Sequence, residues 1–154
     1  MSRQPADPTR HLVLVGCSAE KTPTQQTLAA IDLYDGGCIP PLRVRLGQEP
    51  RLRARVRFLS AQHGLITADT PLRTYDRPLD PARAAELRPT VWDRLQTELL
   101  ETGMPTDILV MAEPLYLVLI ADLLAAPERP RVHWIPDHAH GWPHAAAILD
   151  HWKW

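Results

Sequence analysis

Four short, mostly apolar runs stand out in the pattern of hydrophobic and polar residues along the chain. They cover His11–Gly16, Val56–Ser60, 107–112 and 132–136. Each run is rich in Val, Ile or Leu and is bounded by Gly, Pro or polar residues. A run of this kind is typical of a strand that is buried on both faces, as central parallel strands are. We therefore expect a strand at each position.

Between these runs, apolar residues recur at helical spacing in four segments. The segments are 27–34, 81–102, 117–125 and 144–152. The second has the clearest boundaries, because Asp80 before Pro81 suits a helix N-terminus and Gly103 suits a helix end. Pro89 could break it.

The remaining stretches predict connections. Pro40-Pro41 followed by Gly47 predicts a loop, and 67–81 predicts a longer one. Over 51–57 arginine alternates with apolar residues, which suits a half-exposed strand as well as a helix end.

This alternation of strand and helix predicts the fold class. We expect an α/β fold, a single three-layer domain with a mostly parallel sheet of about four to five strands flanked by helices. Residues 1–10 are polar and proline-bearing, which predicts a flexible N-terminal tail before one α/β domain over 11–154.

Composition and charge narrow the setting. The 154 residues carry a formal net charge of −1, so no global field draws the chain to nucleic acid or membrane. No apolar run reaches the roughly 20 residues that a membrane-spanning helix needs. Two cysteines, Cys17 and Cys38, do not make a disulfide framework. We expect a cytoplasmic protein without a membrane partner, and homo-oligomer formation stays open.

One local concentration of charge departs from this balance. Six arginines fall within fifteen residues: Arg43, Arg45, Arg51, Arg53, Arg55 and Arg57. They could form a phosphate-binding face for nucleic acid, or they could mark only the solvent side of their elements.

The end of the first strand run carries a candidate ligand loop. Cys17 and Ser18 follow Gly16, and Lys21 comes three residues later. Backbone amides and the Ser18 hydroxyl could hold a phosphate, with Lys21 supplying charge. The complete P-loop pattern is missing, so nucleotide hydrolysis is not indicated. The alternative is a tight turn with a buried structural cysteine, and a nucleophilic Cys17 is the less favoured role.

The stretch 59–66 carries the main catalytic candidate, since there an apolar run meets small residues, His63 and Gly64. A histidine at a strand end can transfer a proton near neutral pH, and glycine frees the backbone to turn. In the next loop, Tyr75 and Asp76 could supply a ring for stacking and a carboxylate base. The alternatives are a histidine bonded to loop carbonyls and a Tyr-Asp pair that anchors the loop.

Glu113 and His138 follow the third and fourth strand runs. A carboxylate at a helix N-terminus stays ionised, so Glu113 could orient a water or bind a sugar hydroxyl, or it could simply cap the helix. Histidines at 138, 140 and 144 match no structural zinc pattern. We therefore expect no metal and no cofactor, with a metal-dependent hydrolase as the lowest alternative. Because strand ends share one edge, these clusters predict a single site.

Five motifs follow one another along essentially the whole chain. They are Val15-Gly16-Cys17-Ser18-x-x-Lys21, Asp32-Leu33-Tyr34, Leu59-Ser60-Ala61-Gln62-His63-Gly64-Leu65, Tyr75-Asp76-x-x-Leu79 and Ala112-x-x-x-Tyr116. Their order resembles a bacterial and phage domain family of unknown function. The middle block is distantly similar to YaaA peroxide-stress proteins. The first is similar to an element in the uracil-DNA-glycosylase-like domain of archaeosine-type tRNA-modifying enzymes.

These resemblances imply a nucleobase, nucleotide or nucleic-acid ligand without fixing a reaction. The chain departs from the family pattern at Ala112-Glu113, where Ala-Gly is expected, and in a tail richer in histidine over 137–142. The preferred hypothesis is an enzyme that hydrolyses or exchanges an N-glycosidic bond. Asp76 or Glu113 would be the carboxylate, His63 the proton donor, and Tyr75 or Tyr116 the stacking ring. The alternative is a non-catalytic nucleotide- or nucleic-acid-binding module, related to stress.

Overall fold

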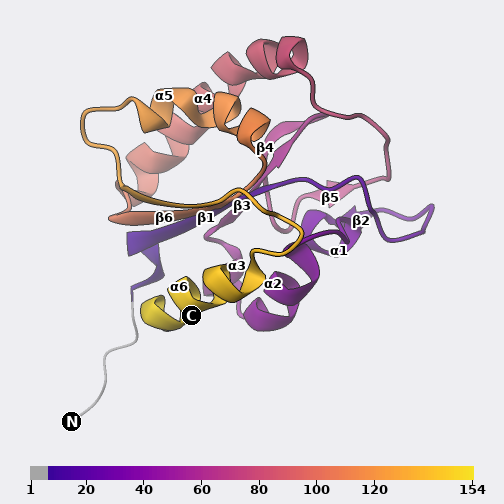
Figure 1. The fold of residues 1–154 in the computed structure, drawn as a ribbon, viewed down its shortest axis with the longest axis horizontal. Coiled ribbons are helices and arrows are strands. Elements are labelled where there is room, and N and C mark those ends of the chain that lie inside the picture. The colour runs from indigo at the N-terminus through magenta and orange to yellow at the C-terminus, as the bar shows by residue number, and fades with distance from the viewer. Residues whose placement is uncertain (1–6) are drawn as a thin grey trace.

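A five-stranded sheet runs through the computed structural model, which describes residues 7–154 (Figure 1). Its strands are β1 (His11–Gly16), β3 (Val56–Ser60), β4 (Gly64–Thr67), β6 (Asp107–Met111) and β7 (Arg131–Ile135), in the order β4-β3-β1-β6-β7. All neighbours pair in parallel except β4, which is antiparallel to β3. The predicted α/β class, with a mostly parallel sheet between helices, is confirmed.

Helices cover both faces of the sheet (Figure 1). One face carries α1 (Ala30–Leu33), α2 (Ile39–Leu46) and α6 (Trp142–Trp152), and α3 (Pro50–Arg53) leads from α2 into β3. The other face carries α4 (Pro81–Thr102), the 3-10 helix η2 (Pro114–Ile120) and α5 (Ala121–Leu124). A separate two-stranded ribbon pairs β2 (Leu28–Ala29) with β5 (Pro71–Leu72).

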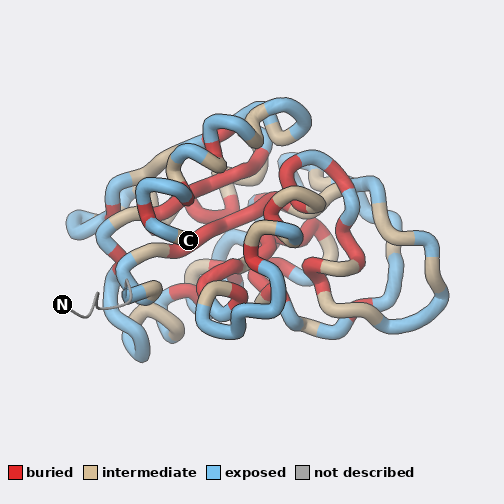
Figure 2. Tube along the Cα trace, turned by 90° about the horizontal axis from the view of Figure 1, so that it is seen from below, coloured by how far each residue is buried: buried red, intermediate tan, exposed pale blue. Residues whose placement is uncertain are grey.

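The central strand β1 explains why the layers hold together. Val13 and Val15 pack into the core of the α2 and α6 face, whereas Leu12 and Leu14 pack into the core of the α4 face. All four side chains are at most 2 % exposed. Each fully buried aliphatic side chain contributes about 1.5–3 kcal/mol, which is why this strand reads as continuously apolar. Figure 2 shows the buried stretches running through the middle of the molecule.

Strands are added to the sheet on both sides of β1. From β1 the chain crosses to β3 through the helices of one face, and it later reaches β6, on the other side of β1, through α4 on the opposite face. The segments that follow β1 and β6 therefore leave the sheet toward opposite faces. A crevice opens where neighbouring parallel strands diverge in this way.

Several predicted elements differ in the structure. Residues 27–34 form β2 followed by the single turn α1 instead of one helix. The loop predicted at Pro40-Pro41 is wrong, because α2 begins at Ile39. Prolines in a first helical turn lack only amide hydrogens that have no partner there, so they fit this position. Gly47, with φ of 54°, then ends the helix.

Other differences concern the second half of the chain. The run 56–60 continues through a turn into β4, so 59–66 is a hairpin. Pro89 lies inside α4 without ending it, and Asp80 caps that helix by accepting from the Arg83 amide. The predicted helix 117–125 is a 3-10 segment followed by α5.

The N-terminal segment is partly described. Residues 1–6 of the predicted tail lie outside the described residues, and Pro8–Arg10 forms a 3-10 turn capped by Asp7. Within residues 7–154 no helix is long and apolar enough to cross a bilayer.

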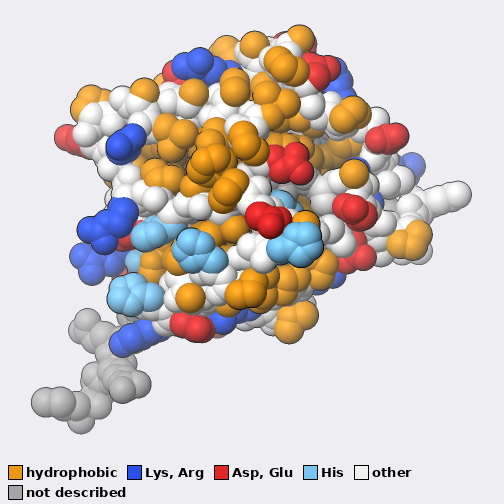
Figure 3. Space-filling view, in the orientation of Figure 1, with side chains coloured by type: hydrophobic (Ala, Val, Ile, Leu, Met, Phe, Trp, Pro, Cys, Tyr) orange, Lys and Arg blue, Asp and Glu red, His pale blue; other side chains and the backbone are white. Residues whose placement is uncertain are grey.

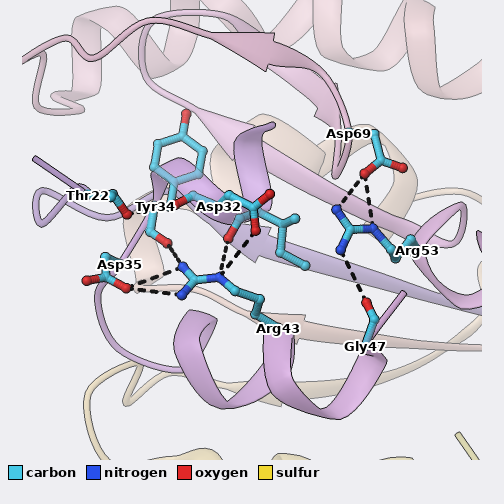
Figure 4. A network of polar contacts seen from close by, with 9 residues as sticks. Thr22, Asp32, Tyr34, Asp35, Arg43, Gly47, Arg53 and Asp69 are labelled. Atoms are coloured by element: carbon cyan, nitrogen blue, oxygen red, sulfur yellow. Dashed lines mark hydrogen bonds and ion pairs between the residues drawn. The ribbon is translucent and has the colours of Figure 1, made fainter. Parts of the chain in front are cut away.

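The arginine cluster is built into the fold. Arg43 donates to the carbonyls of Ile31 and Tyr34 and pairs with Asp35, and Arg53 pairs with Asp69 and donates to the Gly47 carbonyl (Figure 4). These contacts satisfy backbone carbonyls at the ends of short helices, which otherwise have no donors.

The other four arginines are likewise engaged. Their partners are Asp150 for Arg45, Glu49 for Arg51, Glu98 for Arg57, and the carbonyls of Pro8, Thr9 and His11 for Arg55. A phosphate would have to displace these partners, so the cluster is not a ready phosphate-binding face.

Replacing Arg55 tests this structural role. Arg55 is 5 % exposed, so Arg55→Ala removes a buried donor to three carbonyls and should lower the free energy of unfolding by about 2 kcal/mol in urea denaturation. Arg51 is 63 % exposed and pairs with its neighbour Glu49, so Arg51→Ala should stay within about 0.5 kcal/mol of the parent. Equal effects of the two substitutions would contradict the assignment.

Candidate functional site

A cavity of about 430 Å³ lies where the chain leaves β1 and β6. Its volume falls in the range of small-molecule sites, and its position is the crevice that the strand order creates. Seven of the ten predicted site residues line it: Cys17, Ser18, Lys21, Asp76, Glu113, Tyr116 and His138. The predicted shared site is thus largely assembled, but three predicted members are missing from the lining.

The loop after β1 is held together by its own polar side chains. The Ser18 hydroxyl donates to the Glu20 carbonyl at 2.6 Å and accepts from the Gly36 amide at 3.2 Å. The Lys21 ammonium donates to the carbonyls of Ser18 and Ala19. Ser18 is therefore engaged in shaping the loop, and the predicted phosphate contact from its hydroxyl would compete with these bonds.

Tyr116 of η2 lines the cavity and packs against the start of this loop. Its ring packs close to Gly16, where an added Cβ would lie 3.4 Å from the tyrosine Cγ. The Tyr116 hydroxyl and the Cys17 thiol share a hydrogen bond of 3.2 Å. Burial raises the pKa of Tyr116, and the nearby Cys17 and Glu113 act in the same direction. The phenol consequently stays protonated at neutral pH, and its hydrogen is available to a ligand when the Cys17 thiol is the donor of their shared bond.

Carboxylates reach the cavity from three separate segments. Glu20 comes from the loop after β1, Asp76 from the loop before α4, and Glu113 from the junction of β6 and η2. Glu113 is exposed and makes no side-chain capping bond to η2, so its carboxylate is available to a ligand. The simple capping role considered for Glu113 is therefore not what the structure shows.

His138 fastens the cavity wall through both ring nitrogens. Nε2 donates to the Gly16 carbonyl at 3.2 Å, and Nδ1 accepts from the Cys38 amide at 3.3 Å. The Cys38 thiol also donates to the His138 carbonyl. Burial lowers the pKa of His138, in keeping with a neutral ring whose second nitrogen must accept. His138 thus joins β1, the start of α2 and the loop after β7.

The other histidines are dispersed. Figure 3 shows histidine side chains spread along the side of the molecule that carries α6. His140 lies beside Asp137, and His133 bonds Asp107 at the opposite end of the sheet. Among residues 7–154 no group of three or more His, Cys, Asp or Glu side chains is placed to hold a metal ion.

His63, Gly64 and Tyr75 lie outside the cavity lining. His63 is exposed on the turn of the β3-β4 hairpin, with its ring edge-on to that of Tyr75. Partial burial of the ring lowers the pKa of His63. Gly64, with φ of 75°, begins β4 and packs toward Val91 of α4. Because β3 turns back as a hairpin, its end does not present His63 to the crevice.

Tyr75 contacts Lys21, a residue of the cavity lining. The Lys21 ammonium lies 4.5 Å from the centre of its ring, a cation–π contact. Its hydroxyl bonds those of Tyr34, at 2.5 Å, and Ser60, at 2.8 Å. Ser60 in turn accepts from the amides of the hairpin turn. Burial raises the pKa of Tyr34 to about 12, so this network stays protonated and positions Lys21.

Sequence reasoning missed several lining residues. Glu20 lies inside the predicted loop, and Arg77 and Pro78 follow the predicted Asp76, so widening each motif by a few residues would have found them. Gly37 follows the segment 27–34 and belongs to none of the predicted site motifs. A glycine pair can also signal a close backbone approach, here of His138 to Gly37.

Two glycines make a matched test of the His138 contact. Gly37 and Gly47 have similar φ values, 59° and 54°, so alanine strains the backbone at both. An added Cβ at Gly37 overlaps Nδ1 of His138, whereas at Gly47 nothing lies within 4 Å. Gly37→Ala should therefore lower the midpoint of urea denaturation more than Gly47→Ala. Equal midpoints would show that His138 does not hold this wall.

The neutral state of His138 predicts a pH dependence. Its folded pKa lies below the ordinary value of 6.5, so the unfolded chain takes up the proton first as pH falls. The stability that His138 contributes is complete above about pH 6.5 and is lost as pH falls toward its folded pKa. The melting temperature of the parent should drop more between pH 7.5 and pH 5 than that of His138→Gln. Parallel pH profiles would contradict this.

Comparisons of the chain with models of protein families, with curated protein sequences and with solved structures gave no match. What the protein does is accordingly argued from the residues of the cavity.

Proposed function

We propose that this protein hydrolyses or exchanges the N-glycosidic bond of a nucleoside or nucleotide in the cavity between the ends of β1 and β6. The observation that carries the proposal is the convergence of Asp76 and Glu113, from different segments, beside the protonated phenol of Tyr116. Carboxylates facing a hydrogen-bond donor are what cleavage at an anomeric carbon requires.

The cavity suits such a ligand in size and lining. A volume of about 430 Å³ accommodates a nucleoside-sized molecule. Leu79, Leu115 and Pro78 contribute apolar surface for a base. The carboxylates can accept hydrogen bonds from sugar hydroxyls.

The residues divide the reaction between them. As the C–N bond breaks, positive charge develops on the sugar, and the carboxylates of Asp76 and Glu113 stabilise it. Glu113 accepts a proton from the attacking water, whose oxygen bonds the anomeric carbon. The base takes the bonding electron pair while Tyr116 donates a hydrogen bond to it, and the proton held by Glu113 finally leaves with the base. In exchange, a second base would attack in place of water.

Tyr116, and not His63, is the hydrogen-bond donor to the departing base in this proposal. His63 is exposed on the hairpin turn and outside the lining, whereas Tyr116 lines the cavity. A raised pKa makes Tyr116 a hydrogen-bond donor and not a strong acid, so the proton must come from water.

The two alternatives have less support. A nucleic-acid-binding module would draw its phosphate contacts from the arginine cluster, whose members are bonded to carboxylates and carbonyls. A metal-dependent hydrolase would need a histidine cluster, and His138 spends both nitrogens on backbone groups. The resemblance to uracil-DNA-glycosylase-like domains remains consistent with glycosidic chemistry and stays a prediction.

The test is release of free base from a panel of nucleosides and nucleotides, followed by chromatography. Removing the water-activating carboxylate should cost about 100-fold or more in kcat, so Glu113→Gln should be nearly inactive. Tyr116→Phe should lower kcat because it removes the donor to the departing base. His63→Ala should stay near the parent rate.

The matched control is Glu128→Gln, which removes an exposed carboxylate away from the cavity lining. It should leave turnover unchanged. Full activity of Glu113→Gln, or absence of base release from every compound with folded parent protein, would refute the proposal.

A further inference from the structure

We infer that the cavity selects a nucleoside without a phosphate group over the corresponding nucleotide. This rests on the proposed function and names the substrate class of the same site. The charged groups that line the cavity are the carboxylates of Glu20, Asp76 and Glu113 and the cations Lys21 and Arg77, and His138 beside them is neutral.

The ammonium hydrogens of Lys21 are largely engaged within its own loop. Two of its three hydrogens go to the carbonyls of Ser18 and Ala19, at 3.2 and 3.4 Å. Its ammonium also lies 4.5 Å from the centre of the Tyr75 ring, whose face attracts cations. Lys21 therefore braces its own loop, and a phosphate would find one free hydrogen at most.

Arg77 does not supply a replacement. It is exposed, and its Nη1 reaches the Gln62 side-chain carbonyl at 3.4 Å, toward the hairpin turn. This guanidinium extends along the rim between two loops. For Nη1 to take part in a bidentate phosphate contact, the usual strength of arginine, it would have to release Gln62.

The carboxylates carry no such compensation. Within residues 7–154, Glu20, Asp76 and Glu113 take part in none of the ion pairs that form between side chains. The three negative charges outnumber the two positive charges of Lys21 and Arg77 in the lining, so the cavity disfavours an added dianion. The carboxylates also accept hydrogen bonds from neutral sugar hydroxyls. The same charges favour a transition state that is positive at the sugar.

The hydrogen bonds of the loop after β1 also disfavour a phosphate group. Ser18 donates its hydroxyl hydrogen to the Glu20 carbonyl and so has none to offer a phosphate oxygen. Of the groups expected to form an anion cradle after Gly16, the Ser18 hydroxyl is thus engaged within its own loop. The same loop brings a negative charge to the lining, the Glu20 carboxylate, which lies against Gly36.

The experiment compares kcat/KM for base release from the ribonucleosides and deoxyribonucleosides, their 5′-monophosphates and a single-stranded oligonucleotide. At low salt the nucleosides should be preferred over their monophosphates by about tenfold or more. Glu20→Gln, which removes one negative charge outside the assigned catalytic groups, should reduce that preference by about threefold or more. Glu128→Gln, away from the cavity lining, should leave it unchanged.

The outcomes separate the two claims. Equal or faster turnover of monophosphates or of the oligonucleotide overturns the charge selection and leaves glycosidic cleavage standing. A preference that Glu20→Gln does not alter overturns the role given to the cavity charges. Absence of base release from all compounds, with the protein folded, overturns the proposed function and the inference with it.

Discussion

The parallel pairing of β1 with β6 is the constraint on which the rest of the molecule depends. The two strands lie side by side with five residues of β1 in register, yet the chain leaves them toward opposite faces of the sheet. The segments that follow β1 and β6 therefore meet at the edge between the strand ends, where Cys17, Glu20, Glu113 and Tyr116 line the cavity.

Loops at this edge leave backbone groups without partners in helices or in the sheet, and polar side chains bond them. Lys21 and Ser18 bond carbonyls of their own loop, and His138 bonds the Gly16 carbonyl and the Cys38 amide. After these obligations, the side chains left free at the cavity are chiefly carboxylates. The site is therefore mainly anionic in character, because the Lys21 hydrogens bond carbonyls of its own loop while the carboxylates of Glu20, Asp76 and Glu113 remain available.

Much of the fold could be predicted from the sequence. Burial on both faces makes β1 and β6 read as apolar runs, and Asp80 with Gly103 marks the ends of α4. The helix α2 was missed because its prolines suggest a loop when their position within the first turn is unknown. Which loops meet was predictable from the rule that strand ends share one edge.

The roles of single residues were less predictable, because they depend on where each side chain points. Gly64 was correctly read as a turning point, but the turn leads back into β4 and carries His63 out of the crevice. Ser18 suits a phosphate ligand by its residue type, but its hydroxyl donates to the Glu20 carbonyl, a bond that the sequence does not reveal. Hydrogen bonds between residues a hundred positions apart, such as His138 with Cys38, leave no local pattern.

The most direct measurement of the central claim is a crystal structure of Glu113→Gln with a nucleoside, which this variant should bind without cleaving. The ligand should lie in the cavity between the ends of β1 and β6. Its sugar should lie within hydrogen-bond distance of the side chains at positions 76 and 113, and its glycosidic nitrogen near the Tyr116 hydroxyl. A nucleoside bound elsewhere, for instance in the groove of Leu124, Val132 and Trp134 beside β7, with the cavity filled only by water, would contradict it.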